Sequence, residues 1–189
     1  MADRDVLTAV EAAYLQHFEV APDRASVSFL GVEPIEILRY ADGGIDHFLS
    51  LGMSRHAMVD PALAVIDSES PRGELMLSAR TPPGDLWKSV AILAAAPAVE
   101  GVVYAVGNRI DLGQPLVAGS RCTGGILQRS ALRPVNVAGL SDVLVFQVLP
   151  ATANELAWAR IHGTDSLVAR WKQAATELTD LMRESVRLI

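Results

Sequence analysis

The side chains that could act as nucleophiles are few and scattered along the sequence. Cys122 is the sole thiol, and Ser54 ends the short run Leu51-Gly52-Met53-Ser54. A nucleophilic thiol or hydroxyl needs a base within hydrogen-bonding distance, and the local sequence supplies none for either residue. Ser54 also lacks the G-x-S-x-G turn that presents a hydrolase serine. An enzyme such as a hydrolase that uses Ser54 or Cys122 is therefore kept as the alternative hypothesis, and a non-enzymatic protein is favoured.

The acid–base and metal-binding residue types give a similar result. No two of the four histidines lie three or four residues apart, and no C-x-x-C pair exists, so no zinc motif or cofactor is expected. Glu155 and His162 could share a helix face as an acid–base pair. However, Thr152 and Glu155 have the spacing of a helix capping box, which explains Glu155 without catalysis. We then expect Thr152→Ala to destabilise by roughly 1 kcal/mol and Glu155→Gln by less, because glutamine can still close the box.

Composition limits the classes of partner and the compartment. The chain has 189 residues, half of them hydrophobic, and a net charge of −6, which fits a globular protein and argues against nucleic-acid binding. No apolar run reaches the roughly 20 residues that cross a bilayer, so no membrane association is expected. A single cysteine excludes an internal disulfide, and the N-terminus does not resemble a signal peptide. The cytoplasm is the expected location.

Hydrophobic periodicity predicts strands in runs with helices at the start, middle and end. This pattern favours an α+β fold with a mixed central β-sheet flanked by helices. In the strand Glu74–Arg80, the alternation predicts that Leu75, Leu77 and Ala79 face the core while Glu74, Met76, Ser78 and Arg80 do not. The remaining expected elements are a helix over Asp3–Val20; strands over Ala25–Leu30, Ile35–Tyr40 and Ile45–Leu51, with a turn at Asp42-Gly43-Gly44; an irregular segment over 52–71; a helix over Leu86–Ala96 that Pro97 ends; short strands over Val102–Val106, Arg109–Leu112 and Gly124–Arg129; and a buried strand over Val143–Leu149 that Pro150 ends.

Mostly apolar residues repeat in the C-terminal part at alternating spacings of four and three: Leu167, Trp171, Ala174, Leu178, Leu181, Ser185 and Leu188. This spacing predicts a coiled-coil-like helix. We divide the chain accordingly into a domain over 1–175 and a C-terminal helical extension over 176–189. A lone amphipathic helix needs a surface for its apolar stripe, so it packs either on its own domain or against a second copy in a homodimer.

Five motifs in a fixed order resemble the Suppressor of fused domain family. They are FLSLGMS (48–54), GELMLSAR (73–80), a helix with Trp87 that ends in ILAAAP, GNRIDLGQPL (107–116), and the strand–proline–capped helix of VFQVLPATANELAWARIHG (145–163). The resemblance runs from about Phe29 to Trp171. It implies a mixed sheet flanked by helices and a cytoplasmic protein-binding function. Bacterial single-domain members resemble the chain more closely, which implies an immunity protein that neutralises a toxin encoded nearby.

The resemblance also indicates a binding segment. The animal protein that gives the family its name adds an extended peptide of its partner as a strand, and the matching segment here is Val102–Gln114. The peptide-contacting tyrosine and aspartate of the animal members are replaced here by Val102 and Gln114, and the second domain is missing, so that ligand is not carried over. The predicted protein-binding residues of this edge-strand segment are Val102, Tyr104, Asn108, Arg109, Asp111 and Gln114.

Overall fold

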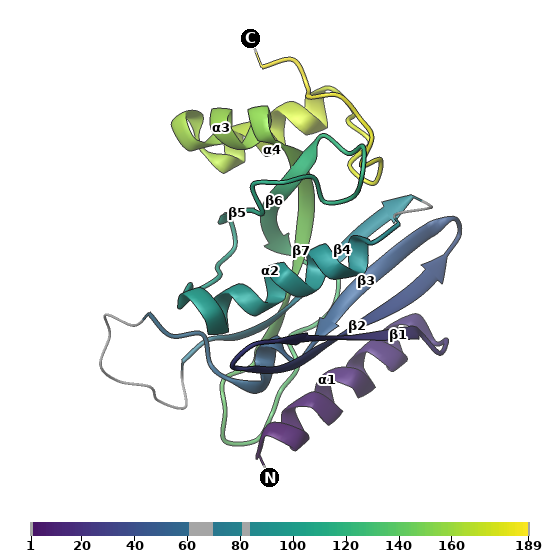
Figure 1. The fold of residues 1–189 in the computed structure, drawn as a ribbon, viewed down its shortest axis with the longest axis vertical. Helices are drawn as coiled ribbons and strands as arrows, with labels where there is room; N and C mark the ends of the chain where they lie inside the picture. The colour runs from purple at the N-terminus through teal and green to yellow at the C-terminus, as the bar shows by residue number, and fades with distance from the viewer. Residues whose placement is uncertain (1, 61–69, 81–83, 189) are drawn as a thin grey trace.

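One mixed sheet organises the molecule. The computed structural model describes residues 2–60, 70–80 and 84–188. Within these residues, seven strands form a sheet in the order β1-β2-β3-β4-β7-β6-β5, which four α-helices flank, so the predicted α+β class is confirmed. The elements of Figure 1 are α1 (Ala2–Phe18), β1 (Asp23–Phe29), β2 (Val32–Asp42), β3 (Ile45–Leu51), the 3₁₀ helix η1 (Met53–Arg55), β4 (Arg72–Arg80), α2 (Leu86–Glu100), β5 (Arg109–Asp111), β6 (Cys122–Arg129), β7 (Val143–Thr152), α3 (Ala153–His162) and α4 (Thr164–Gln173).

The three strands predicted around the turn at Asp42-Gly43-Gly44 form an antiparallel meander, which β4 extends by one strand. β2 and β3 pair up to Asp42 and Ile45, so Gly43 and Gly44 form a two-residue turn, and both have positive φ as such hairpins require. β4 pairs with β3 on one side and runs parallel to β7 on the other. Part of the irregular segment predicted over 52–71 is η1, and its residues 61–69 lie outside the described residues.

Helices cover both faces of the sheet. α2 packs on the face that carries Leu75 and Leu77, while α1 packs through Val6, Val10 and Tyr14 on the opposite face. Figure 1 shows α1 near the N-terminus at one end of the molecule, with α3 and α4 beside the C-terminus at the other. Because both faces are covered, the predicted alternation of β4 is wrong at two positions. Glu74 and Met76 are buried, with 0% and 6% of their surface exposed.

The predicted helix stop at Pro97 is also wrong, because α2 continues through Pro97 to Glu100. A proline inside a helix leaves the carbonyl four residues earlier without its amide donor. Here that carbonyl belongs to Leu93, and the Tyr104 hydroxyl donates to it at 2.8 Å. The helix ends instead at Gly101, which is left-handed (φ 69°), as many helix C-caps are. A donor from the following segment therefore makes the internal proline tolerable.

Pro150 does not end β7 either. Ser130 N donates to Val145 O, and the alternation of the antiparallel ladder then directs the nitrogen of Pro150 away from β6. On that side the ladder with β4 stops at Val148, so the missing amide donor interrupts no hydrogen bond. The strand consequently continues to Thr152, where α3 begins.

The chain after α4 departs most from the prediction. α4 ends at Gln173, Ala175 has a φ of 47°, and residues 174–188 contain no helix, so the predicted C-terminal helical extension is wrong. This C-terminal tail (residues 174–188) packs on the domain itself and buries Leu181 and Arg183. The helix on which the homodimer was predicted is therefore not formed. The segment Val102–Val106, predicted as a strand, is also irregular.

Candidate functional site

The predicted edge strand does lie at an edge of the sheet. β5 pairs with β6 alone, through a register that places Asp111 opposite Gly124. A Cβ atom on Gly124 would lie 2.0 Å from the carbonyl oxygen of Ile110, so the two strands can approach this closely because the residue is glycine. The contact between β5 and β6 thus leaves no room for a side chain at position 124.

The outer side of β5 directs backbone groups away from β6. Asn108 O accepts from Leu127 N, and Leu112 N donates to Thr123 O, which fixes the residues that face β6. Because alternate residues of a strand direct their backbone groups to opposite sides, Arg109 and Asp111 direct theirs outward. Within the described part of the chain, these outward N–H and C=O groups have no backbone partner. Unpaired groups of this kind are a template for another strand.

Four of the six predicted site residues line a groove of about 450 Å³ beside this edge. They are Val102, Tyr104, Asn108 and Arg109, which are joined there by Asp60, Gly101 and Val103. Asp111 and Gln114 lie outside the groove and are exposed. The segment is therefore brought together in space, and its role in binding stays a prediction.

Two of the groove residues also have a structural role. Tyr104 is 7% exposed; burial, with a smaller contribution from Glu100, raises the pKa of its hydroxyl, which is used to bond Leu93 O. The Asn108 side chain accepts from Ala105 N at 2.9 Å and so stabilises the turn before β5. Arg109, Asp111 and Gln114 are the predicted site residues whose side chains are exposed.

The two hydrolase candidates are both buried. Ser54 is 0% exposed, and its hydroxyl donates to Glu74 Oε1 at 2.6 Å. Cys122 is also 0% exposed, and burial raises the pKa of its thiol to about 11, so the thiolate is scarce at neutral pH. Neither side chain, as placed, can reach a substrate. Among the described residues, no group of three or more His, Cys, Asp or Glu side chains could hold a metal ion.

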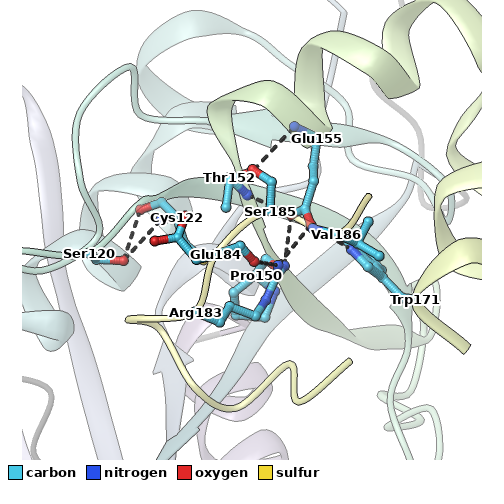
Figure 2. A network of polar contacts seen from close by, with 10 residues as sticks. All are labelled: Ser120, Cys122, Pro150, Thr152, Glu155, Trp171, Arg183, Glu184, Ser185 and Val186. Atoms are coloured by element: carbon cyan, nitrogen blue, oxygen red, sulfur yellow. Dashed lines mark hydrogen bonds and ion pairs between the residues drawn. The ribbon is translucent and has the colours of Figure 1, made fainter. Parts of the chain in front are cut away.

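Glu155 is the centre of a buried polar network, which Figure 2 shows. The capping box is confirmed: Glu155 N donates to Thr152 Oγ1, and Thr152 N donates to the Glu155 carboxylate. The same carboxylate accepts from Trp171 Nε1 at 3.0 Å and from Val186 N at 2.8 Å. Arg183 donates to both of its oxygens, at 2.7 and 2.8 Å. Glu155 therefore joins α3, α4 and the C-terminal tail.

The electrostatics of this network are those of a buried ion pair. Burial by itself would raise the pKa of Glu155, but hydrogen bonds from Arg183, Val186, Thr152 and Trp171 outweigh it and hold the pKa below its ordinary value. Arg183 also donates to Pro150 O, the part of β7 that β4 no longer covers. His162 is exposed and stacks on Trp158, so the proposed acid–base pair with Glu155 is not formed.

A second buried carboxylate, Glu74, was not predicted from the sequence. It accepts from the hydroxyls of Ser50 and Ser54 and from the backbone N–H groups of Gly52 and Ser54. The donors belong to the motif FLSLGMS and the acceptor to GELMLSAR, so the two motifs meet in one cluster. The signal available in the sequence was an acidic residue followed by three core residues, together with a serine-rich turn.

The mixed sheet with α1 and α2 on its two faces, followed by a capped helix after β7, defines a Suppressor of fused-like α+β domain. The sequence profile described as Suppressor of fused protein (SUFU) matches residues 31–184, more than half of the chain. The chain therefore belongs to the Suppressor of fused family. Members of this family are generally protein-binding domains without catalytic activity.

Solved structures show the same fold. The putative SUFU homolog from Neisseria gonorrhoeae FA 1090 has 14% identity and a TM-score of 0.66, over 97% of this chain and 96% of that one. A chain of the Sufu–Fu complex has 12% identity and a TM-score of 0.69, over 97% and 91%. Drosophila Suppressor of fused gives 12% and 0.69, over 96% of this chain and half of its own length. No curated protein matches the sequence. No helix in the described ranges is long and apolar enough to cross a membrane.

Proposed function

We propose that this chain is a protein-binding domain that accepts an extended segment of its partner as a further strand along the outer edge of β5. The observation that supports this most directly is the pair of residues Arg109 and Asp111, whose backbone groups point away from β6 at the end of the sheet. Main-chain hydrogen bonds give such strand addition its affinity, and adjacent side chains give it selectivity.

The groove beside β5 supplies the selectivity. It combines apolar surface from Val102 and Val103 with charged groups on Asp60 and Arg109. Alternate side chains of an added strand point to the same face, so every second residue of the partner segment would enter or pass this groove. A side chain with an apolar stem and a polar end suits such a lining.

We further propose that the partner is a toxin encoded by a neighbouring gene and that both proteins meet in the cytoplasm. The support is the resemblance to bacterial single-domain members, together with a net charge of −6 that is complementary to a basic toxin. Coexpression of the chain with each neighbouring gene product tests this, and rescue of growth is the expected result. Growth arrest that the chain does not relieve would exclude that gene product as the target.

Asp111→Pro tests strand addition directly. Proline removes the outward N–H of Asp111 and leaves the hydrogen bonds to β6 intact. Asp111→Ala is the matched control, because it loses the same carboxylate and the same bond from Gly113 N but keeps the outward N–H. With a partner identified by coexpression, we expect copurification to be lost in Asp111→Pro and kept in Asp111→Ala, at equal melting temperatures. Equal binding by both variants would exclude the edge of β5.

A further inference from the structure

A second groove lies on the face of the sheet that α1 covers, at the C-terminal end of that helix. Two adjoining pockets of about 460 and 490 Å³ form it, and both are lined by His17 and Ala131. Each volume falls within the range of small-ligand sites. The strand-addition proposal uses the edge of the sheet at β5, whereas this groove lies on a face of the sheet. Strand addition therefore does not explain the groove.

The floor of the groove is polar and lies on central strands. His47 is paired with Ser78 across β3 and β4, and Met76 is paired with Gln147 across β4 and β7. His47 Nδ1 lies 2.8 Å from Ser78 Oγ. Burial lowers the pKa of His47, so its imidazole is neutral at neutral pH. The floor therefore offers hydrogen-bonding groups without a charge of its own. Polar side chains at the centre of a sheet face are unusual where the same face is otherwise apolar.

The charge of the groove comes from its rim. Arg129 lines one pocket and Arg133 the other, and both side chains are exposed. Neither forms an ion pair within the described residues, and Asp42 is the carboxylate that lines the groove there. Ser130 lies between the two arginines in the sequence, and its buried hydroxyl has no hydrogen-bond partner. In a chain with net charge −6, two unpaired arginines beside an unsatisfied hydroxyl form a local cationic site.

We propose that this groove binds an oxyanion, a phosphate or carboxylate group, held by Arg129 and Arg133 at the rim and by the buried hydroxyl of Ser130. Guanidinium groups match the geometry of both oxyanions, and a hydroxyl donor completes the set. Polar groups of the floor, Ser78 and Gln147, face the remainder of the ligand. The unsatisfied Ser130 hydroxyl gains a partner when the oxyanion binds, which favours the bound state.

Titration with inorganic phosphate at constant ionic strength tests this. Binding is monitored by isothermal titration calorimetry and by amide NMR chemical shifts. A second titration uses an acetylated and amidated tetraglutamate peptide, which separates a phosphate ligand from a carboxylate one. We expect one of the two to bind with shifts at residues 129–133. The double variant Arg129→Gln/Arg133→Gln should lower the association constant roughly tenfold or more, and Ser130→Ala should lower it several-fold.

Arg160→Gln is the matched control. Arg160 is also an exposed arginine without an ion pair in the described residues, but it lies on α3, at the end of the molecule opposite α1 (Figure 1). It should leave binding unchanged, and Asp111→Pro should do so as well, because the proposal does not depend on the edge of β5. If neither probe binds, or if Arg160→Gln weakens binding as much as the double variant, the groove is not an oxyanion site.

Discussion

Glu74 and Glu155 are both buried carboxylates that accept hydrogen bonds, but their donors differ. Glu74 lies inside the sheet and accepts hydrogen bonds from neutral donors of β3 and the turn after it, 20 to 24 residues away in sequence. Glu155 lies at the start of α3 and accepts from a guanidinium, an indole and two backbone amides, two of these donor residues in the C-terminal tail. Burying a carboxylate is unfavourable unless its oxygens are satisfied, and both sites satisfy them fully.

The difference lies in what each carboxylate holds in place. Glu74 fixes Gly52, whose φ of 140° is one that few residues other than glycine adopt, and so fixes the path of the chain out of β3. The cluster links β3 and η1 to β4, which is the middle strand of the sheet. The tail that Glu155 holds is the last part of the described chain. It contacts the end of β4, where Arg80 N donates to Thr179 O at 2.8 Å and the Arg80 side chain pairs with Glu177, so its release would break these contacts while leaving the strand pairing of β1 to β4 in place. We therefore expect Glu74 to control global stability and Glu155 to control local docking of the tail.

The largest expected effect is that of Glu74→Ala. It removes a buried acceptor from two hydroxyls and two amides at once, so we expect a loss of roughly 4 kcal/mol or more in the free energy of unfolding. Urea denaturation followed by circular dichroism measures it, and the loss should appear as one cooperative transition. Glu74→Gln keeps the shape and one acceptor oxygen and should cost less. If Glu74→Ala had the same free energy of unfolding as the wild type, the assignment of this cluster to the core would be wrong.

Arg183→Ala should have the next largest effect, but a local one. It leaves the Glu155 carboxylate without its cation, and breaking a buried pair in this way costs up to about 3–5 kcal/mol. Release of the tail lets water reach Glu155 and limits the loss. Because Leu181 packs in the same cluster as Cys122 and its carbonyl accepts from Ser120 Oγ, the released tail uncovers the thiol.

The rate of thiol labelling of Cys122 without denaturant distinguishes these two cases. It should rise sharply in Arg183→Ala, while Glu74→Ala should label only through global unfolding. Arg187→Ala is the matched control, because Arg187 is an exposed arginine of the same tail. Labelling that rises equally in Arg183→Ala and Arg187→Ala would show that the ion pair does not hold the tail.

Thr152→Ala and Glu155→Gln distinguish the contribution of the capping box from that of the ion pair with Arg183. Thr152→Ala should cost roughly 1 kcal/mol, the usual loss for a helix N-cap. The capping box alone predicted that Glu155→Gln would be milder. The structure reverses this order, because the glutamine would leave Arg183 buried without its counter-charge, at a cost of roughly 2 kcal/mol. Urea denaturation of both variants, with Thr152→Ser as the control, tests the order.

The predictions from the sequence held where structure depends on neighbours in the chain. The Gly43-Gly44 hairpin, the meander around it and the capping box of Thr152 and Glu155 all rest on local spacing, and all are present. The predictions failed where a distant residue supplies a missing partner. Tyr104 satisfies the carbonyl that Pro97 leaves free, a bond that no local pattern reveals.

The C-terminal tail and the site show the same limit. Residues at alternating spacings of four and three predicted a helix up to Leu188. The tail instead forms turns and irregular segments, and Glu155, 28 residues before Arg183, holds it against the domain. The edge position of Arg109 and Asp111 was predicted through the family resemblance, since nothing local distinguishes an edge strand from a central one. The site of Arg129, Ser130 and Arg133 could not be predicted, because the α1 end and strands that complete the groove are distant in sequence.

The smallest expected effect is the dependence of stability on pH that comes from Glu155. Its pKa is held below the ordinary value in the folded state, so the unfolded state takes up a proton first as the pH falls. The stabilisation is complete above the ordinary glutamate pKa, near 4.3, and is lost as the pH falls through the lower folded value. Between pH 7 and 5 it should therefore be constant.

The difference in unfolding free energy between the wild type and Glu155→Gln isolates this contribution from that of the other carboxylates. We expect the difference to be constant from pH 7 to 5 and to shrink below about pH 4, because a protonated Glu155 resembles glutamine in charge. Hydrogen exchange of the Val186 amide, which donates to Glu155, should accelerate relative to its pH-corrected rate over the same range. A difference that stayed constant to pH 3 would mean that the tail is held by its apolar contacts, with Leu181 as the anchor, and that the two glutamates differ less than their partners indicate.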